Sequence, residues 1–167
     1  MFFIVTENKG LSVCIVKVFA ALTTGCDNRR MTSRISHTTI DCEDAYALSN
    51  WWKKVLKYVD DPEDPNLPGH QECLILPKGE GPKLLFIEVP EGKSGKNRLH
   101  FDLRPTDRTR DEEFDRLLKL GAKYVADHRG IHGPGTGWIV LHDPEGNEFC
   151  ILRSDAEVEA AIAAGLS

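Results

Sequence analysis

The sequence lacks the features that define several large classes of protein. The cysteines are odd in number, and no two of them form a CxxC pair: Cys14, Cys26, Cys42, Cys73 and Cys150. This pattern argues against a disulfide scaffold and indicates a reducing compartment. No apolar run reaches the roughly 20 residues that are needed to cross a bilayer. We therefore predict a cytoplasmic protein with no membrane partner.

An excess of positive charge is also missing. The chain has 21 Lys and Arg against 26 Asp and Glu, a formal net charge of −5. Because no broad basic surface is implied, nucleic acid is not expected as a partner. The 167 residues and the 41% hydrophobic content are those of one ordinary soluble domain with its own core.

The first thirty residues differ from the rest. The segment 11–25 is apolar except for Lys17 and precedes Cys26, which resembles a secretory signal. The leading residues, however, carry little positive charge, and Lys17 interrupts the apolar run. We favour the interpretation that Met31 is the true start and that residues 1–30 are an extension outside the fold.

The rest of the chain predicts two halves with the same order of secondary-structure elements. In the first half we expect a strand at 35–40, a helix from 41–44 to about 57, a surface loop at 60–69 and strands at 72–76 and 83–89. In the second half we expect a strand at 98–104, a helix at 110–120 closed by Gly121, a strand at 123–125 and a hairpin at 137–152. A short helix follows at 156–164. The similarity of the two helices indicates duplication, although two amphipathic helices can also look alike by chance.

Four segments then resemble a known superfamily. They are RISHTTIDCEDAYALSNWWKKVL (34–56), KNRLHFDLR (96–104), LGA (120–122) and DPEGNEF (143–149). Together they look like the vicinal oxygen chelate superfamily, in its glyoxalase-like domain branch, over residues 33–153. The resemblance implies an α+β fold of two βαβββ modules, 33–95 and 96–153, whose curved sheets surround a small-molecule cavity. It leaves 154–167 as a C-terminal helix, and homodimers are common in the superfamily.

The resemblance also implies a ligand set for a divalent metal. The positions that bind metal in metal-dependent members fall on His37, His100 and Cys150, and a fourth falls on Phe86 or, with a shift in register, Glu88. Two imidazoles and a thiolate suit zinc, and nickel, manganese and iron are the other candidates. The alternative is that both histidines are hydrogen-bonded strand residues, that Cys150 is a buried apolar residue and that Phe86 replaces the carboxylate, which removes the metal.

Other polar residues near these positions are candidates for binding and proton transfer. Glu148 lies two residues before Cys150 and is expected on the same face of the strand, as an oxygen ligand or a general base. Alternation places His100, Asp102 and Arg104 on one face of the strand 98–104. On that face Arg104 would bind a carboxylate or phosphate, unless Asp102 and Arg104 only neutralise each other.

The apolar face of the same strand would carry Leu99, Phe101 and Leu103 and pack under the helix. Trp138 would either form a wall of the pocket, where an aromatic ring suits a planar ligand, or fill the core. The glycine-rich segment GIHGPGTG (130–137) is either a lid or a plain surface loop.

These features favour two functions. The first is a lyase- or isomerase-type enzyme acting on a small oxygenated metabolite, metal-assisted, with His37, His100 and Glu148 as catalytic groups. Asp102 and Arg104 would bind its ligand. The second is a non-catalytic protein that sequesters a small molecule or drug, as bleomycin-resistance members of the superfamily do. Phe86 and Trp138 would then line the pocket, and the histidines would be only polar lining.

Overall fold

The computed structural model describes residues 32–165. Residues 35–167 belong to one compact unit, and all that follows concerns its described part. The predicted extension 1–30 and the start at Met31 lie outside the described residues.

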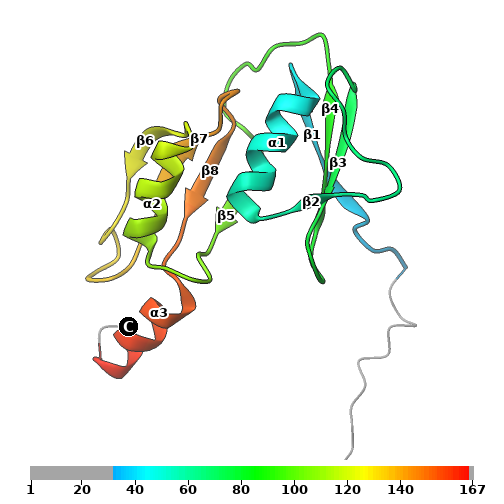
Figure 1. The fold of residues 1–167 in the computed structure, drawn as a ribbon. Coiled ribbons are helices and arrows are strands. Elements are labelled where there is room, and N and C mark those ends of the chain that lie inside the picture. The colour runs from blue at the N-terminus through cyan, green and yellow to red at the C-terminus, as the bar shows by residue number, and fades with distance from the viewer. Residues whose placement is uncertain (1–31, 166–167) are drawn as a thin grey trace, which may run out of the picture. The chain divides into compact units, whose positions relative to one another are not determined.

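The first module is built around a four-stranded mixed sheet. Its elements are β1 (His37–Cys42), α1 (Ala45–Leu56), β2 (Val59–Asp60), β3 (Glu72–Leu76) and β4 (Lys83–Glu88). The strand order is β1-β4-β3-β2, with β1 parallel to β4 and the other pairs antiparallel (Figure 1).

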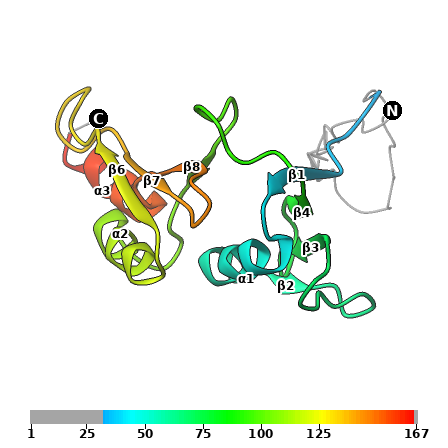
Figure 2. The same cartoon turned by 90° about the horizontal axis from the view of Figure 1, so that it is seen from above.

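The second module repeats this order and pairing. It consists of β5 (Phe101–Leu103), α2 (Arg110–Lys119), β6 (Lys123–Asp127), β7 (Ile139–His142) and β8 (Glu148–Ile151). Its strand order is β5-β8-β7-β6, with β5 parallel to β8 (Figure 1). Figure 2 shows β6, β7 and β8 of this sheet from above. A last helix, α3 (Asp155–Ala163), follows β8. The predicted α+β fold with two βαβββ modules is confirmed.

Capping residues set the ends of the helices. Asp44 accepts a hydrogen bond from the backbone N–H of Ala47 at 2.8 Å and so begins α1. Thr109 and Glu112 form a reciprocal capping box at the start of α2. Gly121 follows α2 with a φ of 99°, a left-handed conformation that glycine adopts without strain.

Two strands differ most from the sequence prediction. The two-residue strand β2 was not expected, because a pair of residues carries no periodicity. The strand predicted at 98–104 is shorter, since only Phe101–Leu103 pair with β8. Leu99 precedes the pairing and is 86% exposed, so the prediction that it packs under a helix was wrong.

Helix α1 contributes to the core of both modules. Its buried face packs on β3 and β4. Trp52, which is 2% exposed, meets the rings of Phe101 and Phe149 from the second module edge-on, at centroid distances of 5.4 and 5.3 Å. Trp51 donates its indole N–H to the carbonyl of Leu120 at 2.8 Å. One continuous core therefore extends through both modules.

The turn between β7 and β8 joins the modules through polar contacts. The side chain of Asp143 has no exposed surface and accepts hydrogen bonds from Trp52 Nε1 (3.2 Å) and from the backbone N–H groups of Glu145 and Asn147. The carboxylate of Glu145 accepts hydrogen bonds from the backbone N–H groups of Glu43 and Asp44, at the start of α1. This turn therefore organises its own hairpin and also holds the first module.

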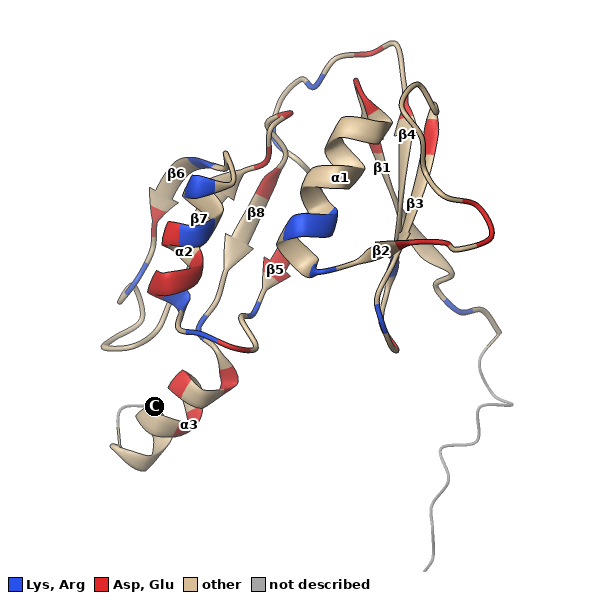
Figure 3. Ribbon diagram, viewed as in Figure 1, with Lys and Arg blue, Asp and Glu red and all other residues tan. Residues whose placement is uncertain are grey.

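Charged residues are distributed unevenly over the helices. Helix α1 carries only basic charge, towards its C-terminal end, whereas α2 carries both signs along its length (Figure 3). Among the described residues, no helix combines the length and apolar character that a membrane span requires.

Replacement of Asp143 tests the polar link between the modules. Asp143→Ala leaves the buried indole N–H of Trp52 and two backbone N–H groups without their acceptor, so we expect the free energy of unfolding in urea to fall by roughly 3 kcal/mol. Asp115→Ala, on the exposed side of α2, is the control and should change it by less than about 0.5 kcal/mol. Equal effects of the two substitutions would contradict this role of Asp143.

Candidate functional site

Two cavities lie next to each other. The larger, here called the junction cavity, has a volume of about 540 Å³ and is lined by residues of both modules, with Trp52 and Phe101 among its apolar residues. The smaller, here called the cluster cavity, has a volume of about 290 Å³ and is lined by residues of the second module and by Lys96. His100 and Glu148 line both cavities.

Three potential metal ligands meet in the cluster cavity. One ligand atom each from His100, Asp102 and Cys150 lies within 4.8 Å of the other two. Asp102 and Cys150 are register partners in the parallel pair β5–β8, and His100 precedes Asp102 by two residues, so it reaches the same side. His100 Nε2 and Asp102 Oδ1 are 3.5 Å apart. We call this group the His–Asp–Cys cluster.

The cluster combines a buried thiol with exposed partners. Cys150 is 5% exposed, whereas the side chains of His100 and Asp102 are about half exposed. Burial raises the pKa of the Cys150 thiol to about 11, and the charge of Asp102 and a hydrogen bond with it act in the same direction. Without a cation the thiol therefore keeps its proton at neutral pH.

Glu148 stands between the two cavities as a carboxylate. Its oxygen Oε2 accepts a hydrogen bond from the backbone N–H of Asn97 at 3.1 Å and pairs with Lys93 Nζ at 3.3 Å. Partial burial acts to raise the pKa of Glu148, but these hydrogen bonds together outweigh it, and the pKa is lowered. His142 Nε2 lies 4.0 Å from Oε1. Glu148 is thus ionised and held in place at neutral pH.

The structure separates the other predicted site residues from this group. His37 is exposed at the start of β1, next to Ser36, and lines neither cavity. Phe86 has no exposed surface and lies in the core, because its face of β4 packs towards α1. Arg104 donates to the carbonyl of Arg153 and pairs with Asp155 at 3.3 Å, rather than with Asp102.

Trp138 lies in the wall of the cluster cavity, and two further polar residues of this wall were not predicted. Lys96 comes from the linker before β5, and His128 comes from the loop after β6. The ring centroids of His128 and Trp138 are 5.2 Å apart. The aromatic contact was not visible in the sequence, because it depends on how the loop 128–138 closes.

The glyoxalase-like domain family matches residues 37–152, which is most of the chain and includes both modules and both cavities. The chain belongs to this family. A search of curated proteins gave no significant match.

Solved structures confirm the vicinal oxygen chelate fold. The fosfomycin resistance protein FosX from Mesorhizobium loti is 16% identical, with a TM-score of 0.55, over 78% of this chain and 99% of that chain. A FosX variant from Listeria monocytogenes, complexed with Mn(II) and 1S,2S-dihydroxypropylphosphonic acid, is 18% identical, with a TM-score of 0.58, over 76% and 94%. The oxidase ChaP-H2 is 17% identical, with a TM-score of 0.50, over 74% and 94%.

The His–Asp–Cys cluster fits a small divalent cation. A tetrahedral zinc ion with bonds of about 2.0–2.3 Å holds its ligand atoms roughly 3.5 Å apart, so the cluster would need to contract by little more than about 1 Å. Imidazole, carboxylate and thiolate are all accepted by zinc, and the thiolate disfavours harder ions such as Mn²⁺.

A second buried thiol gives a pH-dependent test of the junction between the modules. Cys42 is 4% exposed, lines the junction cavity, and donates a hydrogen bond to the carbonyl of Ile87 at 3.3 Å. Burial raises the pKa of Cys42 to about 12, and the carboxylates of Glu145 and Glu88 add to this effect.

We therefore expect alkylation of Cys42 by iodoacetamide at pH 8 to be about 1,000-fold slower in the folded protein than in guanidinium, since only the thiolate reacts. The rate in the folded protein should still rise above pH 10. Peptide mass spectrometry measures Cys42 separately from the other cysteines. Equal rates in folded and unfolded protein would contradict the burial of this thiol between the modules.

Proposed function

We propose that this chain is a metal-assisted enzyme of lyase or isomerase type that acts on a small oxygenated metabolite in the cluster cavity. The observation that carries the proposal is the His–Asp–Cys cluster, which opens into a cavity whose wall also holds the ionised carboxylate of Glu148. Membership of the glyoxalase-like domain family supports it. So does the FosX complex, in which a related fold holds Mn(II) and a dihydroxy compound.

In this enzyme some residues would bind the cation and another would transfer a proton. His100, Asp102 and Cys150 would hold the cation, which when bound polarises a carbonyl, enediolate or diol oxygen as a Lewis acid. Glu148 would accept a proton from the ligand, because its carboxylate is ionised and the backbone N–H of Asn97 and Lys93 fix its position. Lys96 would add positive charge at the wall of the cavity.

A binding protein without turnover is the second candidate. The junction cavity favours it, since about 540 Å³ with Trp52 and Phe101 in the lining is enough to enclose a small drug-like molecule. Phe86, which the sequence placed in such a pocket, does not contribute, because it lies in the core.

Elemental analysis tests the metal site. We expect about one zinc ion per chain after reconstitution and dialysis, and loss of zinc in His100→Ala and Cys150→Ser, because each substitution removes one of the three ligands. His70→Ala, in the loop before β3 of the first module, is the matched control and should retain zinc. Circular dichroism checks that the variants fold. Zinc bound equally by all variants would contradict the site.

The remaining prediction for His37 is tested in the same series. The His–Asp–Cys cluster does not include His37, so His37→Ala should still bind about one zinc ion per chain. Loss of zinc in this variant would add His37 as a ligand, supplied by a second copy of the chain.

Proton exchange distinguishes the enzyme from the binding protein. The zinc-loaded protein should catalyse deuterium exchange at the carbon next to the carbonyl of hydroxyacetone in D₂O, followed by NMR. Glu148→Gln should slow this exchange about 100-fold or more while zinc is retained, because it removes the proton acceptor. No exchange above the protein-free rate, for hydroxyacetone and for a panel of related hydroxy ketones, would favour binding without turnover.

A further inference from the structure

The loop that connects β6 and β7 has a closed base. The backbone N–H of His128 donates to the carbonyl of Trp138 at 2.9 Å, and that of Gly130 donates to Thr136 at 3.0 Å. These bonds continue the antiparallel pairing of β6 and β7 beyond Asp127 and Ile139. The two sides of the loop 128–138 are therefore held together where the loop leaves the sheet.

Gly137 makes the close approach of these two sides feasible. Its φ is 79°, and a Cβ atom at this position would collide with the backbone carbonyl of His128. The chain can thus bring His128 and Trp138 together only with glycine here.

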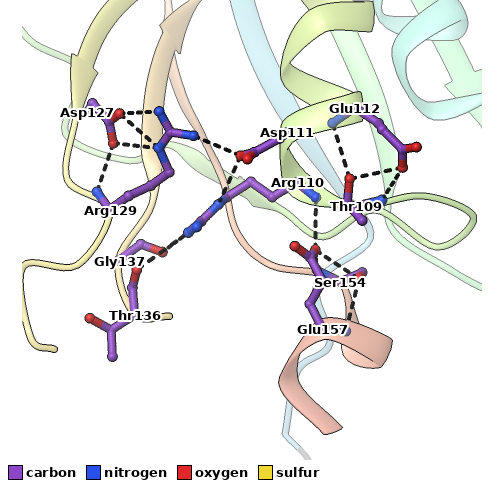
Figure 4. Close-up of polar contacts among 10 residues, drawn as sticks. All are labelled: Thr109, Arg110, Asp111, Glu112, Asp127, Arg129, Thr136, Gly137, Ser154 and Glu157. Atoms are coloured by element: carbon purple, nitrogen blue, oxygen red, sulfur yellow. Dashed lines mark hydrogen bonds and ion pairs between the residues drawn. The ribbon is translucent and has the colours of Figure 1, made fainter. Parts of the chain in front are cut away.

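A buried arginine from α2 holds the same part of the loop. Arg110 is 7% exposed, and its Nη1 donates to the carbonyl of Gly137 at 2.9 Å and to that of Thr136 at 3.5 Å (Figure 4). Its Nε is buried without a hydrogen-bond partner, with Asp111 3.9 Å away. A buried guanidinium that satisfies two loop carbonyls fixes their distance from α2.

A second arginine ties the loop to α2 from its other side. Arg129 pairs with Asp127 at 2.6 Å and with Asp111 at 2.9 Å. Figure 4 shows Arg110 and Arg129 both directed towards Asp111. The two ends of the loop are therefore attached to the first turn of one helix.

The attached loop presents an aromatic surface to the cluster cavity. His128 and Trp138 line this cavity together with the apolar side chains of Val140 and Leu152. The His–Asp–Cys cluster lies in the wall of the same small cavity. A ligand whose oxygen atoms lie at the cluster and whose body stays within this cavity therefore lies beside Trp138.

We propose that the loop 128–138 is a fixed specificity wall, in which Trp138 selects ligands that carry a flat apolar group next to their metal-binding oxygen atoms. Arg110 is the positioning residue that holds this wall through the carbonyls of Thr136 and Gly137. The inference rests on the proposed function in one respect, the placement of the ligand's oxygen atoms at the cluster.

Two hydroxamates that share one chelating group provide the test. Benzohydroxamate and acetohydroxamate bind a cation through the same two oxygen atoms, and only the first carries a ring. We expect the zinc-loaded protein to bind benzohydroxamate about tenfold more tightly than acetohydroxamate, because its ring stacks on Trp138 and is removed from water. Isothermal titration calorimetry gives both affinities.

The variants separate the wall from the metal site. Trp138→Ala should reduce the preference to about twofold or less, whereas Trp138→Phe should retain most of it. Arg110→Met and Arg110→Lys should reduce the preference and leave the affinity for acetohydroxamate unchanged, a result that general destabilisation would not give. Arg108→Met, which removes an arginine that pairs with Asp107 and does not bond to the loop, is the matched control.

The outcomes for the wall and for the metal site are distinct. Equal affinities of the two probes for the wild type, no binding of benzohydroxamate, or a preference that survives Trp138→Ala would each overturn the proposal. If the protein takes up no zinc, the metal-assisted function fails. The affinities of the metal-free protein for the two hydroxamates then test the wall by itself. A tighter binding of benzohydroxamate that is lost in Trp138→Ala would support the proposal, and any other result would overturn it.

Discussion

The polar contact between the turn 143–147 and helix α1 couples the two modules. Asp143 is fully buried and accepts the indole N–H of Trp52, while Glu145 accepts two backbone N–H groups at the start of α1. A buried carboxylate is stable only when hydrogen bonds satisfy it, and these donors come from both modules. The turn therefore fixes the second hairpin and the first helix against each other, and the aromatic core around Trp52 closes beside it.

This contact also positions the two cavities. Asp143 and Glu145 line the junction cavity, and β8 begins one residue after Asn147, so the same turn places Glu148 and Cys150. Glu148 belongs to both cavities and Cys150 to the cluster cavity alone. The most specific motif of the sequence, DPEGNEF, thus mainly holds the hairpin and helix α1 in place. Its Glu148 also lines both cavities.

Local sequence signals predicted much of the fold because they are decided by neighbouring residues. Asp44 caps α1, Gly121 ends α2 in a left-handed conformation, and the turn residues of 143–147 form the hairpin where they were expected. Other features depend on pairing and packing that periodicity does not record. Alternation placed Leu99 on an apolar face, but β5 pairs only from Phe101 onwards, and Leu99 remains exposed.

The candidate site could likewise be predicted only in part, because strand pairing and packing decide which of the candidate residues meet. His100, Asp102 and Cys150 were all named as candidates, but their meeting depends on the parallel register of β5 and β8, which a crossover connection sets. Phe86 lies in the core because its face of β4 packs towards α1, and His37 lies outside both cavities. His128 had no signal in the sequence, since only the closed base of the loop 128–138 brings it to Trp138.

X-ray absorption at the zinc edge would show whether the His–Asp–Cys cluster holds the ion, because it measures the atoms that surround the ion. The His–Asp–Cys cluster predicts one sulfur ligand at about 2.3 Å together with nitrogen or oxygen ligands at about 2.0–2.1 Å. Cys150→Ser should abolish the sulfur contribution. A shell of nitrogen and oxygen alone in the wild-type protein would rule out Cys150 as a ligand of the ion.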